Sequence, residues 1–261
     1  MSGSRRTKAL LLAALFLAAP LSLPAQSAST GLLPDIQTIV PKQVQIVNAH
    51  QRELLRFSNG IVNTGAGHFR LRPELVDSGA GVEQHAIQEI LDADGNIVAE
   101  YDVSRYEFHV AHDHWHIDAV AQFEIKSGSA GPTGQVVGGR SIKVTFCLID
   151  WYKLDDNPAH TEVTYFHCGA SHQGISPGWV DQYHQATEGQ QLDITGMPAG
   201  DYYLVSTSNP DRTFVETDLD NNVAWVKFRL SRSNSGNPGL SILGHSSCGS
   251  PGLCGEQKDN R

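Results

Sequence analysis

Four histidines fall within eight positions of one short segment, EFHVAHDHWHID, which spans residues 107–118. They are His109, His112, His114 and His116, and the last three alternate with other residues. On a β-strand, residues two apart share a face, so the three alternating imidazoles would point the same way. Imidazole ligands without thiolates suit copper(II) or zinc. The segment therefore predicts a transition-metal site. The alternative, a set of ordinary surface histidines, explains the period of two less well.

The spacing of these histidines also limits how they can share one ion. On a straight strand, His112 and His116 would lie about 13 Å apart at about 3.3 Å per residue. An imidazole–metal bond is only about 2 Å long. We therefore expect a β-bulge or the start of a strand near Ala111–Asp113. Otherwise the site would use two of the three alternating histidines together with His109.

Composition restricts the class of protein. The chain has 261 residues, 40% of them hydrophobic, and a formal net charge of -9. These values predict a packed core and exclude sequence-independent binding to nucleic acid, which needs a basic surface. An acidic surface favours the approach of a cationic partner, such as a lysine-rich peptide or a small amine.

The N-terminal segment has the pattern of a signal peptide. Arg5, Arg6 and Lys8 precede an apolar run over residues 9–19 that is short for a membrane span. We predict removal of residues 1–27 and a secreted or periplasmic protein without membrane attachment. The alternative is an uncleaved N-terminal anchor.

Export would make disulfides more favourable than free thiols for the four cysteines. Three pairings of Cys147, Cys168, Cys248 and Cys254 are possible. Cys248 and Cys254 enclose the turn-rich GSPGL, which favours a bond between them and leaves Cys147 with Cys168. The alternative is that the cysteines are buried and reduced.

The rest of the chain predicts β structure. Runs such as HIDAVAQFEIKS and NNVAWVKFRLS alternate or stay apolar over strand lengths, with glycine and proline between them. No long amphipathic helix is evident. We predict an all-β fold, an antiparallel β-sandwich core with long loops and little helix. From residue 231 to residue 261 the composition predicts a loop-rich C-terminal tail with a small disulfide loop.

The histidine run resembles the copper-binding stretch of the lysyl oxidases, which has the form H-x-H-x-H. Other segments resemble that family in the same order, namely LPDI, LLRFSNGIVNTGAGHF, KVTFCLID, HCGASHQGISPGWVDQY, LDITGMPAGDYYLVSTSNP and ETDLDNN. The resemblance covers residues 33 to 230 and implies a lysyl oxidase-like catalytic domain over residues 28–230. The small number of cysteines and the signal peptide imply a bacterial-type secreted member.

The resemblance also implies a cofactor. It places copper ligands on the three alternating histidines and an additional family histidine at His109. It places on Lys143 and Tyr183 the two residues that cross-link into lysine tyrosylquinone. These two residues lie 40 positions apart in the chain, so their meeting is a prediction about the tertiary fold. Without the resemblance, they would be an ordinary strand lysine and a loop tyrosine.

The reaction implied is oxidative deamination of peptidyl lysine or another primary amine by O₂. It yields an aldehyde and releases ammonia and hydrogen peroxide. A general base must remove a proton from the carbon next to nitrogen. Asp181 and His172 are the candidates, although each could instead be a turn carboxylate or a surface histidine.

The acidic segment ETDLDNN offers a second type of ligand. Glu216, Asp218, Asn221 and Asn222 supply oxygen donors at close spacing, which suits calcium. The segment is not an EF-hand, because the glycine and final glutamate of that loop are absent. The resemblance adds Asp35 from LPDI, which would tie the N-terminal part to the last strands. The alternative is a solvated acidic turn.

Three classes of function fit these observations to different degrees. A copper- and quinone-dependent amine oxidase uses the histidines, Lys143 and Tyr183. A non-enzymatic extracytoplasmic copper-binding protein on the same scaffold would need only the histidines. A calcium-stabilised adhesion or carbohydrate-binding module would use ETDLDNN and leave the histidine run unexplained.

Overall fold

The computed structural model describes residues 30–255 except residues 78, 80, 111, 158, 159, 161 and 170. For residues 138–141 and 143 it describes the backbone alone. The expected signal peptide, residues 1–27, lies outside the described part. Within that part, no helix has the length and apolar character needed to cross a bilayer.

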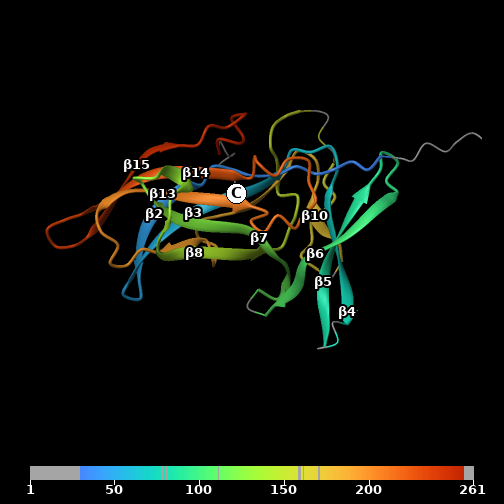
Figure 1. Cartoon of the computed structure of the whole chain (residues 1–261), viewed down its shortest axis with the longest axis horizontal. Helices are drawn as coiled ribbons and strands as arrows, with labels where there is room; N and C mark the ends of the chain where they lie inside the picture. The colour runs from blue at the N-terminus through green and yellow to red at the C-terminus, as the bar shows by residue number, and fades with distance from the viewer. Residues whose placement is uncertain are drawn as a thin grey trace, which may run out of the picture.

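The fold is all-β and confirms the predicted class (Figure 1). A six-stranded sheet contains β1 (Ile36–Thr38), β2 (Lys42–Ala49), β3 (Arg52–Asn63), β9 (Tyr152–Lys153), β11 (Trp179–Tyr183) and β12 (Gln191–Asp193). A nine-stranded sheet contains β4 (Phe69–Asp77), β5 (Val82–Leu91), β6 (Ile97–His109), β7 (His114–Ser127), β8 (Val136–Phe146), β10 (Gln173–Ile175), β13 (Gly200–Ser208), β14 (Val223–Arg232) and β15 (Pro238–His245). One short 3₁₀ turn, η1 (Gly131–Thr133), is the helical element of the described residues. All of the strand pairings are antiparallel.

The core lies between the two sheets. Phe57 of β3 and Phe123 of β7 are both 0% exposed. Their rings meet edge to face with centroids 4.7 Å apart. Such edge-to-face contact adds to the stabilisation that comes from burial of apolar area. Alternate residues of β7 enter this core, as the apolar alternation in HIDAVAQFEIKS predicts.

The nine-stranded sheet bends where β6 meets β7. These strands pair only from Tyr106↔Ile117 to His109↔His114. Beyond this hairpin, the register of β7 on β8 breaks between Ile117 and Ala121, and Ala119 has a left-handed φ of 52°. Figure 1 shows the result: β4, β5 and β6 stand away from the part of the sheet that holds β7, β8 and β13. The histidine segment therefore occupies a corner of the fold.

Two disulfides close loops at the sheet ends. Cys147 follows β8 directly and bonds to Cys168, with a Cα–Cα distance of 5.4 Å. Trp115 of β7 donates its backbone N–H to the carbonyl of Cys168 at 3.0 Å. The first disulfide thus links the end of β8 to a loop that pairs with the histidine hairpin. Cys248 bonds to Cys254 near the C-terminal end of the described chain.

The C-terminal segment differs from the sequence-based expectation of a loop-rich tail. Pro238–His245 forms β15, which pairs with β14 from Arg232↔Pro238 to Val226↔His245. Residues 233–237 make the connecting turn. The high content of serine, glycine and asparagine before the strand concealed its short apolar pattern, and β15 is an edge strand with exposed Ile242.

The core contact leads to a stability prediction. Phe123→Ala removes a fully buried ring and should lower the free energy of unfolding by about 3–5 kcal/mol. Denaturant unfolding measures this change. Phe166→Ala is the matched control, because that ring is 62% exposed, and it should change the stability by less than about 0.5 kcal/mol. Equal effects of the two substitutions would contradict the position of the core.

Candidate functional site

The histidine segment is the tip of the β6–β7 hairpin. β6 ends at His109, β7 begins at His114, and the register places these two residues opposite each other. Asp113 has a left-handed φ of 56°, and the backbone N–H of His112 donates to the carbonyl of His109 at 3.0 Å. The strand start expected near Ala111–Asp113 is confirmed. The turn folds the chain back and so removes the separation that a straight strand would impose.

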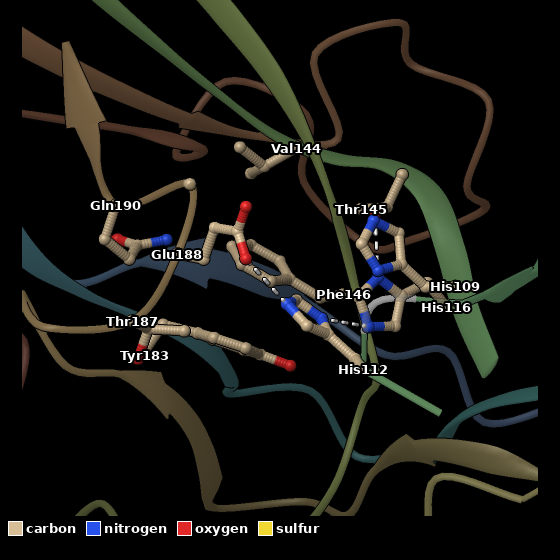
Figure 2. Close-up of a pocket in the computed structure, with 11 residues that line it drawn as sticks. His109, His112, His116, Val144, Thr145, Phe146, Tyr183, Thr187, Glu188 and Gln190 are labelled. Atoms are coloured by element: carbon tan, nitrogen blue, oxygen red, sulfur yellow. Dashed lines mark hydrogen bonds and ion pairs between the residues drawn. The ribbon is translucent and has the colours of Figure 1, made fainter. Parts of the chain in front are cut away.

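Three imidazoles converge at this tip. One ring nitrogen each from His109, His112 and His116 lie within 4.8 Å of one another. The rings of His109 and His116 are stacked with centroids 4.8 Å apart, and His112 Nδ1 lies 3.4 Å from His116 Nε2. In the described part of the chain, no other group of three or more histidine, cysteine or acidic side chains is so placed. Figure 2 shows these rings on one side of a cavity.

His114 lies beside this group without belonging to it. Its ring centroid is 4.8 Å from that of His116 and 5.4 Å from that of His112. It borders a second cavity, described below, rather than the cavity of the other three. The structure therefore brings two of the alternating histidines together with His109, because the hairpin turn returns His109 and His112 to the same place.

The surroundings of these rings fit a bound transition metal. His116 Nδ1 lies 2.8 Å from Thr145 Oγ1, which leaves Nε2 facing the other rings. His109 Nδ1 is buried and has no hydrogen-bond partner among the described residues. On the outer side, His112 Nε2 lies 3.6 Å from Glu188 Oε2. Metal-bound imidazoles usually have their second nitrogen fixed in this way, and a buried polar atom without a partner is costly unless a ligand satisfies it.

The electrostatics of the cluster also favour metal binding. Burial, with smaller contributions from the neighbouring imidazoles, lowers the pKa of His116 to about 4. Burial and then His112 lower the pKa of His114. A neutral imidazole is the form that binds a metal ion. His116 and His114 are thus held in the binding form at neutral pH.

Tyr183 reaches the same cavity from the other sheet. The cavity has a volume of about 270 Å³ and is lined by the three histidines, the end of β8, Tyr183 and residues 187–190. Tyr183 ends β11, its ring stacks on Phe146 with centroids 4.0 Å apart, and its hydroxyl donates to the carbonyl of Cys147 at 2.5 Å. Burial and then the charge of Asp181 raise the pKa of the Tyr183 phenol well above its usual value. In Figure 2 the phenol points toward the imidazoles.

Lys143 lies on β8, opposite Gln122 of β7. It precedes Phe146 by three residues, which corresponds to about 10 Å along a strand at about 3.3 Å per residue. It precedes Thr145, the partner of His116, by two residues. The backbone of the predicted cofactor lysine is therefore on the strand whose end packs on Tyr183 and whose Thr145 contacts the histidine cluster.

Asp181 lies two residues before Tyr183 on β11 and is 2% exposed. Its Oδ2 is buried and has no hydrogen-bond partner among the described residues. Burial, followed by the charge of Asp150, raises the pKa of Asp181 well above its usual value. Asp181 borders the second cavity, which also contains Tyr183 and His114. A buried carboxyl group with a perturbed pKa is a candidate for proton transfer.

His172, the other candidate base, lies elsewhere. Its Nε2 is 3.0 Å from Arg70 Nη2 and 3.2 Å from Glu89 Oε2, in an ion-pair network on β4 and β5. It borders neither cavity. The structure places it in the Arg70–Glu89 network instead, where Glu89 is buried.

The predicted calcium residues are close together but engaged by hydrogen-bond donors. Glu216 accepts from the side-chain amides of Asn209 at 2.6 Å and Asn222 at 2.7 Å, and from the backbone N–H of Ile36 at 2.7 Å. Burial raises its pKa. The loop is thus fixed to the N-terminal strand by the carboxyl group itself.

Asp35 is held in a similar way. Its Oδ2 accepts from Thr64 Oγ1 at 2.5 Å and Gln37 Nε2 at 3.0 Å, and both carboxylate oxygens lie 3.1 Å from Asn221 Nδ2. Asp218 is exposed and accepts the backbone N–H of Asp220 at 2.8 Å. The amide oxygens of Asn221 and Asn222 are buried without a partner among the described residues. Calcium binding here stays a prediction.

Two side chains at the metal site were missed by the sequence analysis. Thr145 and Glu188 lie in segments without any marked local pattern. Thr145 could have been found from its position two residues after Lys143, because alternate residues of a strand share a face. Nothing in the sequence around Glu188 indicates that it reaches His112.

We predict that Thr145 orients the His116 ring. Thr145→Val keeps the shape of the side chain but removes the hydroxyl that contacts Nδ1. The affinity for copper(II), measured by competition with a chelator, should fall about 10- to 100-fold, as for other residues that orient metal ligands. Thr213→Val, at an exposed threonine, is the control and should bind copper as the wild type does. An unchanged affinity in Thr145→Val would show that the hydroxyl does not fix this ring.

We also predict a pH-dependent effect of Asp181 on stability. Because its folded-state pKa is raised above the unfolded value of about 3.9, the folded protein binds more protons than the unfolded chain between these two values. The contribution of Asp181 to the free energy of unfolding therefore falls as pH rises from about 4 to the raised pKa and is constant above it. Asp181→Asn removes this fall, so its stability relative to the wild type should increase over that window.

Denaturant unfolding of both proteins, from about pH 4 to about pH 8, measures this difference. Asp201→Asn provides the contrast, because the hydrogen bond from Arg229 lowers the pKa of Asp201. That substitution should bring no gain with rising pH. A pH-independent difference between Asp181→Asn and the wild type would contradict the raised pKa.

Comparison with known proteins agrees with this site. The lysyl oxidase family model matches residues 82–235, which include the histidine hairpin, Lys143 and Tyr183. Protein-lysine 6-oxidase of Sus scrofa is 31% identical over 138 residues, which are 52% of each chain. That of Homo sapiens is 31% identical over 138 residues, 52% of this chain and 31% of the relative. Lysyl oxidase homolog 2 of Gallus gallus is 28% identical over 184 residues, 70% of this chain and 19% of the relative.

The matched region therefore spans about half or less of the length of these curated relatives. The family model, over residues 82–235, covers more than half of this chain and includes the three converging histidines and Tyr183. The chain belongs to the lysyl oxidase family.

Proposed function

We propose that this protein is an extracytoplasmic, copper-dependent amine oxidase. The overall reaction is R–CH₂–NH₂ + O₂ + H₂O → R–CHO + NH₃ + H₂O₂, in which the amine is oxidised to an aldehyde and O₂ is reduced to hydrogen peroxide. The substrate class is peptidyl lysine or another primary amine, in agreement with the name of the relatives, protein-lysine 6-oxidase. The main supporting observation is that Tyr183 and three converging imidazoles line one cavity.

The residues that would hold copper are the histidines of the hairpin. His112 and His116 occur both in the sequence-based ligand set and in the converging group. His109 belongs to the converging group as well, and His114, with its ring centroid 4.8 Å from that of His116, would be a further donor. Copper, together with a lysine tyrosylquinone derived from Lys143 and Tyr183, would supply the two-electron oxidation of the amine and the transfer of those electrons to O₂.

The protein itself orients the tyrosine. The ring of Tyr183 is held by stacking on Phe146, and its hydroxyl by the Cys147 carbonyl. The disulfide from Cys147 to Cys168 fixes that carbonyl against the loop that contacts the hairpin. Lys143 stands on β8, the strand that also carries Phe146, and the proposal requires its amine to reach the Tyr183 ring.

Asp181 is the residue we assign as proton acceptor. It is buried next to Tyr183, and Oδ2 is free to receive a proton from the carbon next to the amine nitrogen. A carboxyl group with a raised pKa is a stronger base than an exposed one, which is the property that general-base catalysis needs. The place of His172 in the Arg70–Glu89 network makes it the weaker candidate.

Export and a structural calcium ion complete the proposal. Two disulfides suit an oxidising compartment, which the expected signal peptide over residues 1–27 would provide. Calcium would bind at Asp35 and the ETDLDNN loop, where the unpaired amide oxygens of Asn221 and Asn222 offer hard donors. Its role there would be to fix the N-terminal segment to the loop before β14.

The cofactor assignment is tested by two substitutions. Lys143→Ala and Tyr183→Phe should each abolish peroxide release from an added alkylamine, because each removes one half of the cross-link. Copper content, measured by elemental mass spectrometry, should stay unchanged. Lys227→Ala and Tyr203→Phe are matched controls on β14 and β13, where these two side chains contact each other, and both should retain turnover. Turnover in either cofactor variant would reject the assignment.

Intact mass and visible absorption after copper loading in air test the same point directly. A quinone absorption band and the net mass gain from insertion of one oxygen atom with loss of hydrogen are the expected results for the wild type. Bound copper without either signal would instead support the alternative of a non-enzymatic copper-binding protein on the same scaffold.

A further inference from the structure

A second cavity lies against Tyr183, next to the histidine cavity. Its volume is about 310 Å³, and Tyr183 and Thr187 are the residues that border both cavities. The histidine cavity holds the converging imidazoles, whereas the second cavity holds Asp181 and Trp151. Tyr183 therefore lies between the cavity that holds His109, His112 and His116 and the second cavity.

The walls of the second cavity are largely apolar. They include Trp151, Ile149 and the Cys147–Cys168 disulfide. Trp151 is 44% exposed, so the indole lies where the cavity meets solvent. The volume is at the lower end of the range for small-molecule sites, which suits a slender ligand.

Asp181 borders this apolar space and has one buried carboxylate oxygen without a partner among the described residues. Asp181 is 2% exposed, and its Oδ2 accepts no hydrogen bond. Among the described side chains that border the cavity there is no lysine or arginine, and the basic groups there are the imidazoles of His114 and His184. A ligand that donates a hydrogen bond would satisfy this oxygen.

These features specify the chemistry of a ligand. A nitrogen donor must reach the inner carboxyl group, and an unbranched alkyl chain must pass the apolar walls and the indole at the opening. The face of a tryptophan ring attracts both alkyl groups and ammonium groups. A primary amine on a flexible chain of several methylene groups has this form, as in a lysine side chain.

We propose that the second cavity is the amine-binding subsite, in which Asp181 Oδ2 accepts a hydrogen bond from the amine nitrogen and Trp151 packs on the alkyl chain. This inference rests on the proposed amine oxidase function and adds the route by which substrate reaches Tyr183. The amine would approach the face of Tyr183 away from the imidazoles. The histidine cavity would stay free for the metal and O₂, and Trp151 would determine the preference for chain length.

Steady-state kinetics on a series of amines tests the role of Trp151. With ethylamine, butylamine and hexylamine as substrates, Trp151→Ala should raise KM little for ethylamine, about tenfold for butylamine and more for hexylamine, since burial contributes about 0.8 kcal/mol per methylene group. The kcat values, the copper content and the visible absorption should remain those of the wild type. Trp151→Phe should recover most of the loss, because it restores an aromatic surface.

Tyr101→Ala is the matched control, since Tyr101 is also an aromatic residue with 44% exposure but borders neither cavity. It should leave KM unchanged for all three amines. Glu188→Gln tests whether the amine instead enters through the histidine cavity, because Glu188 borders that cavity. A raised KM in Glu188→Gln, together with unchanged KM values in Trp151→Ala, would show that the amine enters through the histidine cavity and would overturn the inference.

Calorimetric titration with butylamine under anaerobic conditions separates this inference from the proposed function. Weaker butylamine binding in Trp151→Ala and in Asp181→Asn than in the wild type would support the subsite. If the wild type bound butylamine in this way but showed no turnover, the proposed oxidase function alone would fail. Turnover in the wild type with butylamine binding unchanged in both variants would reject the subsite and leave the oxidase function standing.

Discussion

The contact between Tyr183 and the end of β8 is the interaction on which the site depends. Tyr183 comes from the six-stranded sheet, whereas Phe146 belongs to the nine-stranded sheet that also carries the histidine hairpin. Their stacking, and the hydrogen bond from the Tyr183 hydroxyl to Cys147, join the two layers at one point. Without that contact, the protein would still hold three imidazoles together, but no redox-active ring would lie beside them.

Burial of the groups around the Tyr183–Phe146 contact shifts their pKa values. The phenol of Tyr183 and the carboxyl group of Asp181 both have pKa values raised mainly by burial, and burial also lowers that of His116. Each shift favours the neutral form of the group. The charged forms of these side chains are therefore unfavourable in the buried site. Perturbed groups of this kind cluster at functional sites because the fold tolerates their cost for the sake of reactivity.

Much of the fold and part of the site could be predicted from the sequence. Apolar alternation in segments such as residues 116–127 was sufficient for the all-β class, because one face of each strand must be buried. The histidine run was visible because four imidazoles lie in one local segment. The inclusion of His109 in the converging group was less accessible, since it depends on the turn at Asp113 and on the cross-strand position of His114. β15 was missed because the turn residues before it dominated the local composition.

The two cavities could not be predicted, because each is formed by residues from distant parts of the chain. Thr145 and Glu188 touch the histidine rings from separate segments, and Trp151 meets Asp181 only after β9 and β11 pair. The same tertiary arrangement has a chemical consequence. A single ring, Tyr183, separates a nitrogen-lined space from a space with one buried carboxyl group. In the proposed oxidase, this arrangement would keep a basic amine apart from the imidazoles of His109, His112 and His116.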